Sequence, residues 1–341
     1  MRKTTTYVLG IIGFLLLGGF VTGNQEDEPV TVWETLIRLG HEPPKYYVEN
    51  LDPVLVKKGY ELVYNGRTKS PTGGMSNYIS PYFVCTDCHN QVQEEPVLTN
   101  FDPQARLEYA VAKDIPFLQS TTFWGITNRE SWYNGDYYLK YDTLVDKARN
   151  DVYEATQLCS KECSSGRYIE QWEWEAINEY YWSLQIKLAD LNLTAKEMQR
   201  VMQGMKDPKM DKALLIDMLK RKYAQASPAD FVDVPENKEK GYDTAPGDPA
   251  NGELIWDKSC KTCHRYGGPS QLVLDDARVT FKKFKKEMTK DSKFSLYEII
   301  RHGTYAEAGH QQYMPLYTAD RMSNQQVEDL RAYIELKAKR R

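Results

Sequence analysis

Two short stretches of the sequence place the same chemistry-bearing residues at the same spacing. Each reads Cys-x-x-Cys-His, and the residues are Cys85, Cys88 and His89 in the first stretch and Cys260, Cys263 and His264 in the second. Three kinds of site hold two thiols and an imidazole in this way: a redox-active dithiol, a zinc site and the covalent anchor of a haem. Two such matches in one chain of 341 residues are too many to be chance.

Covalent haem attachment explains both stretches better than the two alternatives. A thioredoxin-like dithiol needs a βαβ context, and neither stretch is followed by the alternating pattern of a strand. Structural zinc needs four ligands, whereas each stretch supplies three. In a c-type site each thiol bonds one vinyl group of the porphyrin, and the histidine that follows binds the iron. We therefore expect two covalently attached haem c groups, with His89 and His264 as iron ligands.

The second haem has a candidate for its sixth iron ligand. Met314 lies fifty residues after His264 and directly before Pro315, which stiffens the loop. A thioether ligand keeps iron six-coordinate and raises its reduction potential. The alternatives are that Met314 is an ordinary core residue, or that His302 or His310 in the same loop binds the iron.

The C-terminal part, about residues 247–338, resembles a class I cytochrome c over essentially its whole length. The resemblance rests on a helix, the Cys-x-x-Cys-His stretch, a loop, Met-Pro and a last helix, "SNQQVEDLRAYIELKA". It implies a small helical domain that holds one haem and transfers electrons.

The first haem has no Met-Pro sequence after its histidine. A predicted helix at about 143–164 instead ends in "QLCSKEC", which contains Cys159 and Cys163. These two cysteines could form a disulfide, which is near the geometric limit for positions i and i+4 of a helix. They could also be free thiols, or one of them could bind iron. Met75, in a flexible glycine-containing loop, is a further candidate ligand.

Residues of about 52–190 resemble the di-haem cytochromes of the thiosulfate dehydrogenase and SoxA-like kind. The shared features are "GYELVYNG", "YFVCTDCHN", "FWGITNRESWYNGD", "ATQLCSKECSSGR" and "WEWEAINEYYWSLQ". The resemblance implies that Cys159 is the distal ligand of the first haem and the catalytic residue, and that the substrate is a sulfur anion such as thiosulfate. Cys163 is a departure from the family, since a disulfide with it would remove the thiolate. Basic residues in suitable segments are Arg129, Arg149 and Arg167.

The predicted fold is mainly α, with two cytochrome-c-like domains joined by a Pro-rich linker. The expected segments are a signal peptide or N-terminal anchor at 1–23, a first cytochrome domain at 45–192, a helical segment and linker at 193–246, and a second cytochrome domain at 247–341. Within them, helices are expected at about 53–65, 143–164 and 168–190, from Thr194, from Asp248 and at 323–338, and residues 90–142 are expected to be mostly irregular. In both halves a helix with Gly-x-x-Leu or Gly-x-x-Ile precedes the cysteine pair, which suggests two modules of one kind.

The N-terminus indicates export to the periplasm. Arg2 and Lys3 precede an apolar run from Tyr7 to Phe20, and acidic sequence follows. This is the pattern of an export signal, and the run is shorter than the ~20 residues of a comfortable spanning helix. The protein is therefore expected to be periplasmic, either soluble after cleavage or anchored to the inner membrane by this segment. No other segment could span a bilayer.

These features predict an electron carrier. A thiolate ligand lowers the potential of the first haem and a methionine raises that of the second, so electrons would pass from the first to the second. The alternatives are an enzyme that oxidises thiosulfate at the first haem, and a subunit of a larger respiratory complex. Expected partners are a small cytochrome, an oxidase or a quinol-oxidising complex. Residues 260–301 carry ten basic against five acidic residues, which would steer acidic partners, while a net charge of −4 gives no case for nucleic acid.

Overall fold

The computed structural model describes residues 30–304 and 314–339. Within those ranges the backbone forms helices and isolated bridges but no strands, which confirms the mainly α fold. None of the helices in the described ranges is both long and apolar enough to cross a membrane. The predicted signal or anchor lies outside the described residues, as does His310.

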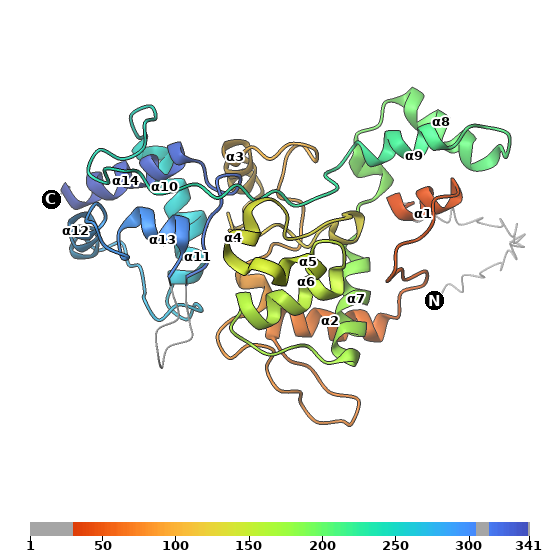
Figure 1. The fold of residues 1–341 in the computed structure, drawn as a ribbon, viewed down its shortest axis with the longest axis horizontal. Coiled ribbons are helices and arrows are strands. Elements are labelled where there is room, and N and C mark those ends of the chain that lie inside the picture. The colour runs from red at the N-terminus through yellow and green to blue at the C-terminus, as the bar shows by residue number, and fades with distance from the viewer. Residues whose placement is uncertain (1–29, 305–313, 340–341) are drawn as a thin grey trace, which may run out of the picture.

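The described chain contains fourteen α-helical segments and two π-helical turns. The helices are α1 (Val32–Arg38), α2 (Pro53–Asn65), α3 (Pro103–Lys113), α4 (Tyr138–Tyr141), α5 (Val145–Ala148), α6 (Val152–Leu158), α7 (Gln171–Ser183), α8 (Ala195–Lys206), α9 (Ala213–Lys220), α10 (Pro249–Ile255), α11 (Lys261–His264), α12 (Arg278–Glu287), α13 (Leu296–His302) and α14 (Asn324–Lys339). The π-helical turns are Cys159–Cys163 and Trp256–Cys260. Figure 1 shows the helices in three groups: α10–α14 at one end, α2 and α4–α7 in the middle, and α1, α8 and α9 at the other end.

The middle group and the C-terminal group are built on the same helix crossing. Gly59 of α2 lies against α7, where an added Cβ would overlap the carbonyl oxygen of Ala176. Gly252 of α10 lies in the same way against the carbonyl oxygen of Asp329 on α14. Because glycine has no side chain, the two backbones can approach closely at both crossings. Each crossing thus brings the helix before a cysteine pair against the last helix of its group.

Three helices begin with the same dipeptide. Asp52, Asp102 and Asp248 each accept a hydrogen bond from a backbone amide of the first turn, and each is followed by proline. An aspartate N-cap satisfies amides that the helix cannot, and proline at the first position loses nothing because its missing amide would have been unpaired there. The sequence therefore specifies where α2, α3 and α10 start.

Two of the helix predictions need correction. The helix expected at about 143–164 is interrupted: α5 ends at Ala148, Asp151 caps a new helix α6, and the chain then widens into the π-helical turn. Residues 90–142 contain a regular helix, α3, that the irregular assignment missed. The Pro-rich segment between α9 and α10 is free of helix, as predicted.

The helix α3 packs against the C-terminal group although it belongs to the N-terminal half of the sequence. Leu107, Ala110 and Phe117 lie in one buried cluster with Trp256 and the apolar face of α14. The amide of Phe117 also donates to the carbonyl of Lys258, at 2.8 Å. The two halves therefore share a core, which fixes the position of one Cys-x-x-Cys-His stretch relative to the other.

Candidate haem sites

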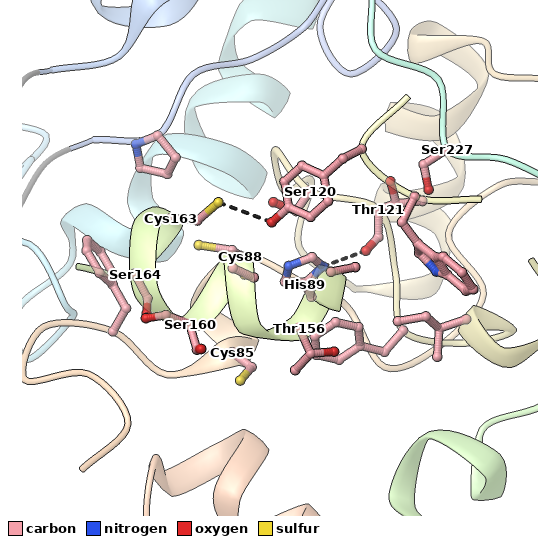
Figure 2. Close-up of a pocket in the computed structure, with 18 of the residues that line it drawn as sticks. Cys85, Cys88, His89, Ser120, Thr121, Thr156, Ser160, Cys163, Ser164 and Ser227 are labelled. Carbon is pink, nitrogen blue, oxygen red and sulfur yellow. Dashed lines mark hydrogen bonds between the residues drawn. The ribbon is translucent and has the colours of Figure 1, made fainter. Parts of the chain in front are cut away.

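The first Cys-x-x-Cys-His stretch opens onto a cavity. The cavity lies between Cys85, Cys88 and His89 on one side and the π-helical turn Cys159–Cys163 on the other. The remaining walls are mostly aromatic or aliphatic. Figure 2 shows Cys88, His89 and Cys163 turned toward the same space. A cavity with this lining is suited to a large, flat, mostly apolar cofactor.

A backbone hydrogen bond orients the histidine of this site. Nδ1 of His89 is 2.6 Å from the carbonyl oxygen of Thr121, and the ring stacks on Phe123 with 4.2 Å between centroids. The Nδ1–H donor fixes the tautomer and leaves Nε2 to bind a metal. Burial lowers the pKa of His89 to about 4, so the imidazole is neutral, as a ligand must be.

The histidine of the second Cys-x-x-Cys-His stretch is also bonded to a backbone carbonyl, although different elements precede it. Here α10 continues through the π-helical turn Trp256–Cys260 into α11, which ends at His264. Nδ1 of His264 is 2.9 Å from the carbonyl oxygen of Leu272. Burial lowers the pKa of this imidazole as well. Both histidines are therefore held neutral with Nε2 available.

Met314 and His302 lie in different surroundings, and the assignment of the iron ligand to Met314 stays a prediction. The amide of Met314 donates to Oγ1 of Thr304 at 2.6 Å, and its side chain packs against the core of the C-terminal group. His302 instead faces outward from α13, with Nδ1 2.7 Å from the carboxylate of Glu298. The loop of residues 305–313 lies outside the described ranges.

The two Cys-x-x-Cys-His stretches touch each other. Sγ of Cys263 lies 3.7 Å from the carbonyl oxygen of Asp87, which is in the turn between Cys85 and Cys88. Pro315 and Leu316, which follow Met314, contribute to the wall of the first cavity. The segment that follows Met314 in the C-terminal part is thus also part of the wall of the first site.

The comparison with protein families decides the nature of the C-terminal part. Residues 249–336 match the family described as cytochrome c. The C-terminal part of the chain is a cytochrome c domain. It carries covalently bound haem c and has a role in haem-based electron transfer. Comparison of the chain with the curated proteins and with the solved structures gave no significant match.

In the cytochrome c domain the matched range includes Cys260, Cys263, His264 and Met314. The first site lies outside that range, so its fit to a haem rests on its own residues. Two donors in its wall, Nε1 of Trp132 and Nε2 of Gln119, are buried and have no hydrogen-bond partner among the described residues. Haem carries two carboxylates that accept from such donors. The residues that line the first site therefore fit a haem.

The distal wall of the first site holds both candidate cysteines. Cys159 and Cys163 are not joined by a disulfide, and both line the cavity. Hydrogen bonds from Cys159, and from the hydroxyls of Tyr133 at 3.2 Å and Tyr141 at 3.0 Å, lower the pKa of Cys163. The hydrogen bond with Cys163, together with burial, raises the pKa of Cys159. A negative charge is therefore better supported on Cys163, while the assignment of the iron ligand to Cys159 stays a prediction.

The basic residues named from the sequence lie in different places. Arg129 lines the cavity, donates to the carbonyl of Thr122 at 2.8 Å, and has no carboxylate within 4 Å among the described residues. Arg167 is paired with Glu173, and Arg149 lies away from the cavity wall. Met75 is 56% exposed and is not part of the wall either.

Sequence reasoning missed Lys140 and the two tyrosine donors to Cys163. Lys140 lines the cavity, and burial lowers the pKa of its ammonium group. The signal that could have found these residues is the aromatic stretch from Trp132 to Tyr141, which contains four tyrosines. What the pattern could not show is that the stretch folds over the cysteine-bearing turn.

Proposed function

We propose that the chain is an exported di-haem cytochrome that passes electrons from a haem at the first site to the haem of the cytochrome c domain. The observation that carries this is the repeated posture of the two histidines, each bonded through Nδ1 to a backbone carbonyl. The repeated glycine crossings of α2 with α7 and of α10 with α14 add a second likeness between the halves. The two segments that would hold the haems are in contact, because Cys263 touches the turn that carries Cys85 and Cys88.

Haem supplies the one-electron exchange between ferric and ferrous iron, and the residues of the chain determine how it is held. The cysteines fix the porphyrin, and the carbonyls of Thr121 and Leu272 orient the imidazoles. The apolar wall of the first site buries His89, which favours the neutral imidazole and strengthens electrostatic interactions inside.

The test is the haem count of the intact protein, purified from cells that mature c-type cytochromes. We expect two covalently bound haems per chain by mass, and two redox transitions by spectroelectrochemistry. One haem per chain, held by the cytochrome c domain alone, would contradict the proposal.

A second candidate function is the oxidation of a sulfur anion such as thiosulfate at the first site. Arg129, which faces the cavity without a carboxylate partner, and the ammonium of Lys140 favour an anion there. The cysteine thiolate of the distal wall, Cys159 by the family resemblance, would lie beside it. We expect thiosulfate to reduce the haems if this function is present, and sulfate, which is equally charged but not oxidisable here, to leave the spectrum unchanged. A spectrum unchanged by thiosulfate, with reduction by a small cytochrome or a quinol-oxidising complex, would favour the carrier.

Docking to an acidic redox partner is supported by one face of the cytochrome c domain. Helix α12 buries Phe281 and exposes four lysines, which are Lys282, Lys283, Lys285 and Lys286. None of the four forms an ion pair with a described residue. Such a face speeds association with acidic proteins and makes the rate depend on salt. The periplasmic location, with the protein either soluble or anchored to the inner membrane by its N-terminus, remains part of this proposal, which fractionation of cells would test.

A further inference from the structure

Four ionisable side chains are buried together where the two halves meet. They are Glu94, Glu95 and Arg106 from the N-terminal half and Arg321 from the C-terminal half, and none is more than 8% exposed. Buried charges are costly unless they are paired and hydrogen-bonded. A cluster of this kind at an interface is therefore expected to fix the positions of the chain segments that it contacts.

Arg321 reaches from the cytochrome c domain into the N-terminal half. Its Nη2 donates to the carbonyl of Ser120 at 2.8 Å and lies 3.2 Å from the carbonyl of Leu118. The same nitrogen is 2.9 Å from Oε1 of Glu94. One guanidinium thus holds the chain from 118 to 120 by its backbone and pairs with a carboxylate beside it.

The held segment continues directly into the carbonyl that orients His89. Thr121 follows Ser120, and its oxygen accepts from Nδ1 of His89 at 2.6 Å. Glu94 contacts the neighbours of both residues that form this hydrogen bond. Its Oε1 accepts from the amide of Thr122 at 2.8 Å, and its Oε2 accepts from the side chain of Asn90 at 3.0 Å.

The ion pair of Arg321 and Glu94 therefore contacts both of the chain segments that form the hydrogen bond of His89. Asn90 is the neighbour of His89, and Thr122 is the neighbour of Thr121, so Glu94 joins the two chain segments that must stay together. Arg321 neutralises Glu94 and prevents the carbonyl segment from moving away. Partners that hold a ligating histidine set its orientation and its basicity.

We propose that Arg321, together with Glu94, is a positioning residue for the iron ligand His89, so that the cytochrome c domain sets the redox properties of the first haem. This rests on the proposed haem at the first site. Arg321 belongs to the C-terminal half, whereas the haem that it would influence is held by the N-terminal half. Its contacts with Ser120 and Glu94 across the interface provide this influence.

The test compares Arg321→Gln and Glu94→Gln in the full-length holoprotein. Arg321→Gln removes a buried positive charge beside the segment that holds His89, so we expect the midpoint potential of the first haem to fall. Glu94→Gln removes a negative charge, so we expect it to rise. The potential of the haem in the cytochrome c domain should move less in both variants. Equal shifts at both haems, or none at the first, would overturn the proposal.

Arg301→Gln is the matched control. Arg301 is also a buried arginine of the C-terminal half and donates to the carbonyls of Tyr317 and Met322, at 3.1 and 2.8 Å. These acceptors belong to its own half. We therefore expect Arg301→Gln to reduce stability but to leave the first haem unchanged. A first-haem shift as large as that of Arg321→Gln would mean that general loosening, and not positioning, explains the effect.

Arg321→Lys separates the charge from the position. Lysine keeps the positive charge, but its single nitrogen lacks the fork of a guanidinium. We expect the potential of the first haem to return toward that of the wild type, while its low-spin electron paramagnetic resonance signal stays altered because His89 is less well held. An unaltered signal would mean that Arg321 acts through charge alone, and the positioning role would be wrong.

The haem count keeps the two proposals apart. One haem in the wild-type protein would remove the basis of both. Two haems with an unchanged first haem in the Arg321 and Glu94 variants would overturn only the positioning role. If Arg321→Gln does not accumulate as folded protein, Glu94→Gln, which changes a single atom, decides the matter by the same measurements.

Discussion

The two Cys-x-x-Cys-His stretches share a posture and differ in nearly everything around it. Both histidines bond a backbone carbonyl through Nδ1, and both follow a helix that crosses its partner at a glycine. In the C-terminal half the helix runs almost directly into the cysteines. In the N-terminal half a loop from Gly66 to Val84 separates α2 from Cys85. The two histidines are thus oriented in the same way, although different backbone segments lead to them.

The opposite walls of the two sites differ more strongly. Met314 in the cytochrome c domain offers a thioether, whereas the first cavity offers the cysteines of a π-helical turn with tyrosine donors around them. A thioether raises the potential of haem iron and a thiolate lowers it. If the proposed haems and ligands are present, two similar supports with different distal groups would give the two haems different potentials within one molecule.

Removal of the cysteine pairs gives the largest expected effect on this comparison. We expect Cys85→Ser with Cys88→Ser to halve the covalent haem content, and Cys260→Ser with Cys263→Ser to do the same at the other site. The measurement is mass spectrometry of the denatured protein together with haem staining. Full haem content in the first double variant would show that the likeness between the sites does not extend to the cofactor.

Substitution of the glycine at either helix crossing gives the next largest expected effect, which is a loss of stability. A methyl group at Gly59 or Gly252 would overlap a backbone oxygen of the partner helix, which cannot move aside as a side chain can. We expect Gly59→Ala and Gly252→Ala each to lower the free energy of unfolding by about 3 kcal/mol, at the upper end of overpacking effects. Denaturant titration of the holoprotein measures this.

Gly74→Ala is the control for the crossings. Gly74 lies in the loop before the first site, where an added Cβ would meet nothing within 4 Å. Its substitution should leave the unfolding midpoint almost unchanged. A cost at Gly252 with none at Gly59 would mean that only the cytochrome c domain depends on a close crossing.

The distal groups allow a sharper comparison. We expect Met314→Ala to lower the potential of the haem in the cytochrome c domain and to open a ligand position there, leaving the first haem unchanged. Cys159→Ser should alter the first haem alone if this cysteine binds the iron. Electron paramagnetic resonance of the oxidised protein separates the two kinds of ligation.

Cys163→Ser distinguishes the two cysteines of the π-helical turn. If the thiolate on Cys163 binds the iron, this variant loses the thiolate signal and Cys159→Ser keeps it. Loss of the signal in the Cys159 variant only would support the assignment made from the family resemblance. An unchanged spectrum in both variants would exclude cysteine ligation at the first site.

The sequence was informative where chemistry is local. Asp52-Pro53 and Gly66 mark the ends of α2, Asp248-Pro249 marks the start of α10, and the cysteine and histidine spacing identifies both candidate sites. Each signal acts within a few residues, through a cap or through covalent geometry. Local signals of this kind can be read without knowledge of the fold.

The parts that the sequence did not predict depend on contacts between distant residues. Helix α3 carries the same Asp-Pro start, at Asp102, but its burial against Trp256 becomes visible only in the fold. The grip of Arg321 on Ser120 joins residues 201 positions apart. The interruption of the helix expected at about 143–164 is partly local, since Asp151 is a good N-cap, whereas the tyrosine donors to Cys163 come from an upstream segment.

The smallest expected effect concerns the charges at the junction of the two halves. Burial raises the pKa of Glu95 to about 8, although Arg321 and Arg106 act in the opposite direction. Its neighbour Glu94 has a lowered pKa, because the same two arginines and the hydrogen bonds from Asn90 and Thr122 outweigh burial. Two adjacent carboxyls at the junction thus differ in charge near neutral pH.

This difference predicts how stability depends on pH. Between the ordinary glutamate pKa of 4.5 and about 8, folded Glu95 holds a proton that the unfolded chain lacks. The contribution of Glu95 is therefore greatest at low pH, falls as the pH rises through this window, and is constant above it. Glu95→Gln mimics the protonated form and should flatten the curve between pH 5 and 8.

Unfolding midpoints of the wild type, Glu95→Gln and the exposed control Glu108→Gln, measured across this window, test the prediction. We expect the Glu95 variant to lose the slope that amounts to about one proton taken up on folding, and the Glu108 variant to keep it. Equal slopes in the wild type and the Glu95 variant would mean that Glu95 is ionised in the folded protein. The two arginines would then balance two carboxylates, and the junction between the halves would be electrically neutral at physiological pH.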